Sequence, residues 1–344
     1  DLATAQQPGT VRAQGREVTQ EQSAPIAGPA NRALDYREEM RRFVQSIGKF
    51  ARKYRRDFQV LPINGLELLV KINSADEDVR NPARTYMRSI NGIVQEGLFY
   101  GIPEIGKPTD EKRRERLLPL ARMAKKTGLK VLVVDYAKAP ETVDAARRLA
   151  AKEGFVFFGT PLRGTEITAV PAYPRRPYGE SANSVVSLNS INNFLVLRET
   201  SGFGQVDEFA LKMHENNFDL IVVDVFHSLD EPLSPRAVET LKYKKLGAKR
   251  LVFAYVDISS AATDDYFWKN NWREGSPRWI GAPVPSDPDR FFVQYWHPEW
   301  RKIITGDTNS YIYGIIRQGF DGVILDGMEN FRFFEGGLEA LALQ

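Results

Sequence analysis

The sequence predicts an α/β protein built as a (β/α)₈ TIM barrel, with an N-terminal helix and long loops at the carboxyl ends of the strands. Eight short runs rich in Val, Ile, Leu and Phe recur along the 344-residue chain, and charged, amphipathic segments separate many of them. Continuous apolar runs of this kind are typical of parallel strands buried on both faces. Eight strand–helix units match a (β/α)₈ barrel. A doubly wound sheet is the alternative, but no Gly-x-Gly-x-x-Gly motif follows the first run.

The first segment of the chain differs in composition from the rest. Residues 1–32 are rich in Ala, Gln, Pro and Gly and contain almost no large apolar side chains. Such a segment cannot bury enough apolar surface to offset the entropy of ordering it. We therefore expect a flexible tail or linker over residues 1–32 and one barrel domain over residues 33–344.

The helices and strands follow from the spacing of apolar residues. Residues 35–58 carry Met40, Phe43, Ile47 and Ala51 on one helical face, with charged residues between them, which predicts an amphipathic helix. The eight predicted strands are 58–64, 92–96, 130–136, 155–161, 219–226, 250–258, 291–296 and 321–327. Further helical patterns cover 109–126, 140–152, 234–245 and 299–318.

Two connections are unusually long. Residues 162–218 separate the fourth and fifth predicted strands, and residues 259–290 separate the sixth and seventh. Loops of this length are usually functional or carry an inserted element.

Composition excludes several classes of chemistry. The formal net charge of +3, from 47 basic and 44 acidic residues, is too small to indicate a nucleic-acid partner. The absence of Cys excludes thiol nucleophiles, disulfides and Cys-ligated metals. No apolar run is long enough to span a membrane. No P-loop, Gly-x-Ser-x-Gly or His-Glu-x-x-His motif is present, and we expect no cofactor.

Polar side chains stand where the predicted strands end, which is where the active site of a (β/α)₈ barrel lies. They are Asn64, Glu96, Asp135, Asp224, Asp257, Asp326 and, shortly after the last strand, Glu329. Carboxylates held close together resist simultaneous ionisation, so some would keep a proton and suit acid catalysis.

Two other readings of these acids remain open. An Asp at a strand end often caps the next helix or binds loop backbone. A ring of carboxylates could also bind a hard cation. We favour no metal, because no dedicated metal-binding loop is present and no two of the three His residues are four positions apart.

Aromatic residues gather near the same end of the predicted barrel. All five Trp fall within residues 268–300, in the connection after the sixth predicted strand and around the seventh. The residues expected to shape a sugar subsite are Tyr136, Tyr255, Tyr295 and Trp296. Aromatic faces beside carboxylates fit glycoside chemistry, in which one acid protonates the leaving oxygen and another acts as base or nucleophile. They would equally hold an amino sugar without cleaving it.

Several motifs in order resemble those of glycoside hydrolase family 114, the endo-α-1,4-polygalactosaminidase-like TIM barrels. The likeness is strongest to the prokaryotic branch, which is sometimes labelled cysteinyl-tRNA synthetase-related. The matching segments are DYREEMRRFV, NGLELL, INGIVQEGLFYG, VLVVDY, FDLIVVDVF, LKYKKLGAKRLVFAYVDI, YFWKNNW, PRWIG, VQYWHPEW and GFDGVILDGMENF. Neither HIGH nor KMSKS occurs, so the synthetase label has no support.

The resemblance implies a secreted, periplasmic or cell-envelope enzyme that cleaves a cationic α-1,4-linked galactosamine or N-acetylgalactosamine polysaccharide in an endo fashion, without a cofactor. It also implies that Asp135, Asp224 and Asp326 occupy the positions of the family's strand-end acids. From the residues we expect Asp326 and Asp224 to be essential acids, with Asp257 or Asp135 as partner. Asn64, Glu96 and Glu329 are expected to help bind substrate.

The chain departs from the family pattern after the sixth predicted strand. Where the family usually has Gly-Glu-Ala-Glu, this chain has Ser259, Ser260, Ala261 and Ala262, so both glutamates are missing. Family members also commonly have Asp at the position of Asn91. Loss of a general acid removes roughly 10²–10⁴-fold of catalysis. The alternative function is therefore a carbohydrate-binding barrel that holds the polymer without cleaving it.

Overall fold

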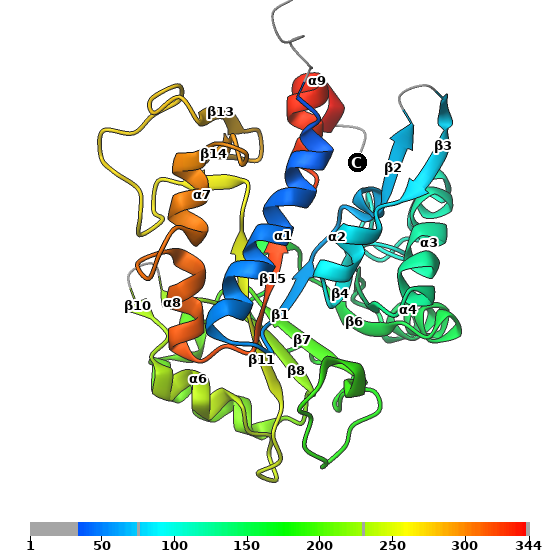
Figure 1. Ribbon diagram of the computed structural model, residues 1–344. Coiled ribbons are helices and arrows are strands. Elements are labelled where there is room, and N and C mark those ends of the chain that lie inside the picture. Colours follow the sequence, from blue (N-terminus) through cyan, green and yellow to red (C-terminus); the bar gives the residue numbers. More distant parts are fainter. Residues whose placement is uncertain (1–33, 74–75, 229–230, 342–344) are drawn as a thin grey trace, which may run out of the picture. The chain divides into compact units, whose positions relative to one another are not determined.

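The computed structural model describes residues 34–73, 76–228 and 231–341. The tail predicted over residues 1–32 lies outside these residues. From Asp35 onward the described chain forms one compact unit of mixed α/β structure with two parallel sheets (Figure 1). No helix among the described residues is long and apolar enough to cross a membrane.

The larger sheet has five parallel strands in the order β1-β15-β11-β8-β7. Its strands are β1 (Gln59–Pro62), β7 (Phe194–Leu197), β8 (Leu220–Asp224), β11 (Leu251–Asp257) and β15 (Gly322–Asp326). Nearly every residue in them is buried, which is why they read as unbroken apolar runs.

The second parallel sheet has three strands in the order β4-β5-β6. They are β4 (Gly92–Glu96), β5 (Lys130–Tyr136) and β6 (Val156–Thr160). A parallel bridge between Ile63 and Val94 joins this sheet to the end of β1. Among the described residues β6 and β7 share no backbone ladder, but Phe158 and Phe194 pack there with ring centroids 5.7 Å apart.

Seven of the eight predicted strands lie in these parallel sheets, but the run at 291–296 does not. It falls at the end of β14 (Asp287–Val293), which pairs antiparallel with β12 (Ser260–Ala262) and β13 (Ile280–Val284). The outer part of β14 is exposed, whereas a central parallel strand is buried throughout. The eighth parallel strand is β7, which lies inside the connection 162–218 that was expected to be loop or insert.

Two short antiparallel strand pairs lie in the loops. The hairpin of β2 (Val70–Asn73) and β3 (Asp76–Pro82) precedes α2 (Arg84–Ser89), and β9 (Phe226–Ser228) pairs with β10 (Glu231–Pro232).

The predicted N-terminal helix is present as α1 (Tyr36–Tyr54), which begins at Asp35 because the Asp35 carboxylate accepts the Glu38 N–H. It contacts α2, α7 (Pro298–Thr305), α8 (Tyr311–Gln318) and α9 (Phe331–Leu341), and its apolar face is buried (Figure 1). The pattern at 299–318 forms two helices, α7 and α8, separated by a turn. The other helices are α3 (Glu111–Lys126), α4 (Pro140–Glu153), α5 (Val206–Lys212) and α6 (Pro235–Leu241).

A buried ion pair attaches the long connection before β7 to the larger sheet. Lys244 Nζ lies 2.6 Å from Asp219 Oδ1, and neither side chain is exposed. Lys244 also donates to the backbone carbonyls of Ser181 and Asn183, while Asp219 Oδ2 accepts the Asn192 N–H. Both charges are therefore compensated by partners from the connection, which fixes its path over the sheet.

Candidate functional site

The strand register brings three of the predicted acids together. Asp257 at the end of β11 pairs with Asp326 at the end of β15, and Tyr255 pairs with Asp224 at the end of β8. The carboxyl ends of adjacent parallel strands thus place these side chains around one pocket.

This acid pocket has a volume of about 290 Å³. The polar side chains that line it are Thr165, Arg198, Asp224, Tyr255, Asp257, Ser260, Asp265, Asp287, Arg290, Tyr311 and Asp326. An adjoining space of about 230 Å³ shares Arg198, Asp224, Asp265 and Arg290 with it. The acid pocket is large enough to hold a sugar unit.

Asp326 lies beside an aromatic hydroxyl and a second acid. The Tyr255 hydroxyl donates to Asp326 Oδ2, and the Gly327 N–H donates to Oδ1 at 2.7 Å. Burial, followed by the negative charge of Asp326, raises the pKa of Asp257. The carboxylate of Asp257 in turn accepts the N–H groups of Ser259 and Ser260 at 2.9 Å and the Ser260 hydroxyl. The charge of Asp326 thus favours the protonated form of Asp257.

Asp224 has fewer hydrogen-bond partners than Asp257. Its Oδ1 accepts the Phe226 N–H at 3.0 Å, and burial raises its pKa, although Arg198 opposes this. A buried carboxyl with a raised pKa beside a cavity is suited to donating a proton.

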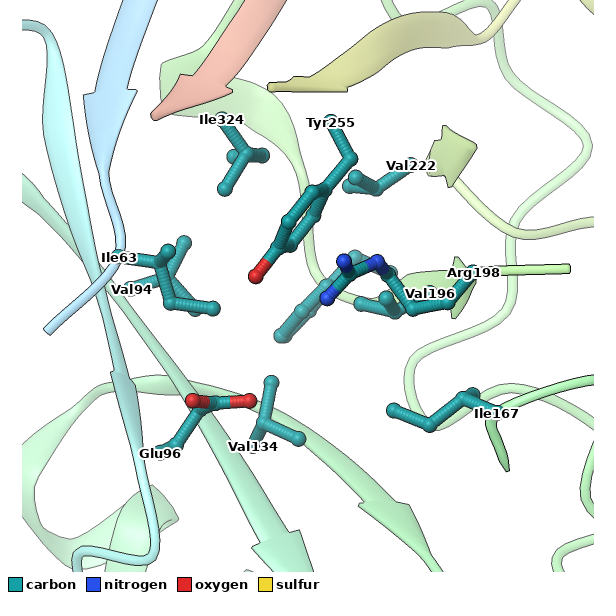
Figure 2. Close-up of a pocket in the computed structure, with 11 residues that line it drawn as sticks. Ile63, Val94, Glu96, Val134, Ile167, Val196, Arg198, Val222, Tyr255 and Ile324 are labelled. Atoms are coloured by element: carbon teal, nitrogen blue, oxygen red, sulfur yellow. The ribbon is translucent and has the colours of Figure 1, made fainter. Parts of the chain in front are cut away.

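Arg198, which was not predicted from the sequence, lines the acid pocket together with these acids. Its guanidinium carbon is 3.3 Å from the centroid of the Tyr255 ring (Figure 2). Burial lowers the pKa of Arg198, but Tyr255, Asp326, Asp224 and Glu96 together raise it. Arg198 directly follows β7, so the signal in the sequence was the run Phe-Leu-Val-Leu-Arg inside the presumed loop.

Glu96 and its neighbours form the opposite wall of a small cavity below Arg198 and Tyr255 (Figure 2). The Tyr136 hydroxyl donates to Glu96 Oε1 at 2.5 Å, and Asn64 Nδ2 donates to Oε2 at 2.8 Å. Burial, with the charge of Asp326 adding to it, raises the pKa of Glu96. Of these three residues Glu96 lines this central cavity, and none of the three lines the acid pocket.

Asp265 and Arg290 also line the acid pocket and were not predicted. Asp265 Oδ2 accepts the Ala262 N–H at 2.7 Å, and burial raises the pKa of Asp265 to about 6. Arg290 Nη1 lies 3.7 Å from Asp257 Oδ2. Asp265 follows the position of the missing second glutamate by three residues, and only the turn after β12 directs it back into the pocket.

Asp135 lies apart from the acid pocket, contrary to the expectation that it serves as a catalytic partner. Side chains alternate along a strand, and because Val134 lines the central cavity, Asp135 faces the other side. It is fully buried, and its Oδ1 accepts the Phe99 N–H at 3.1 Å. Asp135 therefore anchors the backbone that follows β4.

Tyr295, Trp296 and Glu329 also do not line the acid pocket. The Tyr295 hydroxyl donates to the Tyr36 carbonyl, and Trp296 packs against Tyr36 with ring centroids 5.1 Å apart. These aromatics follow β14, which lies outside the parallel sheets, so they cover α1. Glu329 Oε1 lies 3.9 Å from Arg332 Nη2. Burial, with the charge of Glu67 adding to it, raises the pKa of Glu329 to about 7.

The buried Asp135 should make stability depend on pH. Burial raises its pKa from an ordinary 3.8 to about 7, so the folded protein binds this proton more tightly than the unfolded chain. The stabilisation is complete below about pH 4 and is lost as pH rises through 7. Asp135→Asn stays neutral, so the variant should gain stability relative to the wild type between pH 5 and pH 8. Urea unfolding of both proteins at pH 5 and at pH 8 measures their free energies of unfolding. The same difference in free energy between variant and wild type at the two pH values would contradict the prediction.

Among residues 34–73, 76–228 and 231–341, no group of three or more His, Cys, Asp or Glu side chains is arranged to hold a metal ion.

No protein-family model matches the chain. The chain is similar to an uncharacterized protein of Methanocaldococcus jannaschii, with 37% identity over 129 residues, or 38% of this chain and 34% of that protein. It is also similar to an uncharacterized protein of Thermotoga maritima, with 29% identity over 161 residues, or 44% of this chain and 47% of that protein. The matched region thus spans less than half the length of each of these curated relatives.

Proposed function

We propose that the protein is a glycoside hydrolase of the family 114 type that cleaves an α-1,4-linked galactosamine or N-acetylgalactosamine polysaccharide within the chain. The observation that carries this proposal is the pocket in which Asp224, Asp257 and Asp326 meet beside Tyr255. Hydrolysis of a glycoside needs one carboxyl that donates a proton and one carboxylate that attacks or activates water. Such a polymer lies outside the cytoplasm, so the proposal includes a secreted, periplasmic or cell-envelope location.

The proposed scaffold is a (β/α)₈ barrel. In the part of the chain that the structure describes, eight parallel strands follow in the order β1, β4, β5, β6, β7, β8, β11 and β15, and β15 pairs with β1. The Ile63–Val94 bridge and the packing of Phe158 on Phe194 support closure at the two places where ladders are missing. In such a barrel the acid pocket lies at the carboxyl ends of the strands, where the active sites of these barrels are found.

We assign distinct roles to two of the acids. Asp326 is the nucleophile or base, because hydrogen bonds from Tyr255 and Gly327 stabilise its charged form. Asp224 is the proton donor, because burial raises its pKa. Strand β11, which carries Tyr255, lies between the strand of Asp224 and the strand of Asp326. Asp257 adjoins Asp326, whose charge raises the pKa of Asp257, and Arg198 stabilises the anionic state of the pocket.

The charge of the site favours a cationic sugar. The acid pocket and the adjoining space are lined by two arginines, Arg198 and Arg290, and by more than twice as many acids. The acids are Glu199, Asp224, Asp257, Asp264, Asp265, Asp287 and Asp326. An excess of negative charge attracts an amino sugar and disfavours an acidic one.

Cleavage of the polymer tests this function. Incubating the protein with partially N-acetylated poly-α-1,4-galactosamine should release oligomers with new reducing ends, detected by mass spectrometry. The matched control is poly-α-1,4-galacturonate, whose carboxylates the pocket should repel and which should stay intact. No release of oligomers from the amino-sugar polymer would contradict the proposal.

The alternative is a barrel that binds the polymer without cleaving it, and the residues after β11 favour that alternative. Ser260 and Ala262 stand where the resembling family has glutamates, and Ser260 donates to Asp257 instead of offering a proton to substrate. Retention of the polymer on the immobilised protein, with no oligomers released, would support this function over hydrolysis.

A further inference from the structure

A second, larger groove adjoins the acid pocket. It has a volume of about 540 Å³ and lies between the loop from β12 to β13, α7 and the turn before α8. Figure 1 shows these elements on the same side of the molecule. Phe267 lines both the groove and the acid pocket, and Tyr266 lines both the groove and the space beside the acid pocket. The groove therefore adjoins the acid pocket across these two rings.

Aromatic side chains form the wall of the groove. Tyr266 is 53% exposed, and Trp272 is half-buried with its ring edge-on to the buried Trp279, at a centroid distance of 4.9 Å. Trp279 is fixed by its indole N–H, which donates to Glu299 at 3.0 Å. The rings are thus held by packing before any ligand binds, and a rigid aromatic face costs little entropy when it binds a sugar ring.

The charge of the groove differs from that of the acid pocket. Its charged lining residues are Lys269, Lys302, Glu299 and Asp307, which balance to zero. Two of the four are cations, and Lys302 is exposed on α7. The groove therefore lacks the excess of negative charge that attracts a free amine to the acid pocket, and an uncharged unit needs no such attraction.

We propose that this groove binds uncharged, N-acetylated units of the same polysaccharide whose free amino sugar occupies the acid pocket. This inference rests on the proposed function. The two sites together then recognise a partially N-acetylated chain, with aromatic contacts for the neutral units and carboxylates for the cationic one. The shared side chain of Phe267 places the two sites next to each other, which makes the same chain, and not a separate ligand, the occupant.

The test compares two polymers of equal length, one partially N-acetylated and one fully deacetylated. Trp272→Ala should raise KM for the partially acetylated polymer roughly tenfold, which corresponds to about 1.4 kcal/mol of lost binding, and should leave KM for the deacetylated polymer unchanged. Trp296→Ala is the matched control, because Trp296 is also a half-buried Trp but packs against α1. Lys302→Glu, an exposed substitution that should not affect folding, should lower KM for the deacetylated polymer.

The outcomes separate the two proposals. If the wild type cleaves the polymer but neither Trp272→Ala nor Lys302→Glu changes KM, the groove inference is wrong and the function stands. If no polymer is cleaved, the function is wrong, and isothermal titration of N-acetylated oligomers then tests the groove directly. In that case unchanged affinity in Trp272→Ala would overturn the inference, and a selective loss would support a binding groove.

Discussion

Asp326→Asn should lower kcat/KM for the amino-sugar polymer by roughly 10²–10⁴-fold, the range expected when a positioned catalytic acid or base is lost. The amide has nearly the shape of the carboxylate: its oxygen can accept the Gly327 N–H and its NH2 can donate to the Tyr255 hydroxyl oxygen, while the charge is removed. Release of reducing ends, measured at equal protein concentration, gives the result. A thermal unfolding midpoint close to that of the wild type would establish that the variant is folded.

Two further variants make this result specific. Asp287→Asn also removes a carboxylate that lines the acid pocket, but Asp287 is outside the parallel strands and 45% exposed, so activity should change little. Asp224→Asn should recover much of its rate on an aryl glycoside whose leaving group needs no proton, whereas Asp326→Asn should not. Full activity of Asp326→Asn, or equal recovery of both variants, would contradict the assigned roles.

Lys244→Met should reduce the free energy of unfolding by about 3–5 kcal/mol, because removing one partner of a buried ion pair leaves the other charge uncompensated. Asp219 would be left buried with only the Asn192 N–H, and the carbonyls of Ser181 and Asn183 would lose their donor. Urea unfolding followed by circular dichroism measures the change.

The neighbouring residue provides the control for this prediction. Lys245 is exposed, so Lys245→Met should change stability by less than about 0.5 kcal/mol. The double variant Lys244→Met, Asp219→Leu should recover part of the loss, because it removes the unpaired charge but not the lost backbone contacts. Equal stability of Lys244→Met and the wild type would indicate that the pair does not hold the connection in place.

Parallel strands and their terminal acids were predictable because both are local features. Residues 131–134 of β5 are all apolar because both faces of a central strand are buried, and this needs no knowledge of the neighbouring strands. The same reasoning failed for residues 291–296. An apolar run in an antiparallel strand outside the parallel sheets has the same composition as a buried parallel strand. The reasoning also passed over β7, whose four residues are too few to stand out in a long connection.

The sequence by itself determined the mixed α/β class, most of the parallel strands, and the presence of Asp224, Asp257 and Asp326 at strand ends. Only the tertiary structure decided which side chains meet. A shift of one residue along a strand turns a side chain to the opposite face, so Tyr136 points to the central cavity while Asp135 points away. Arg198, Asp265 and Arg290 reach the acid pocket from β7, a turn and an antiparallel strand. Their meeting depends on pairings between distant segments, which no local pattern records.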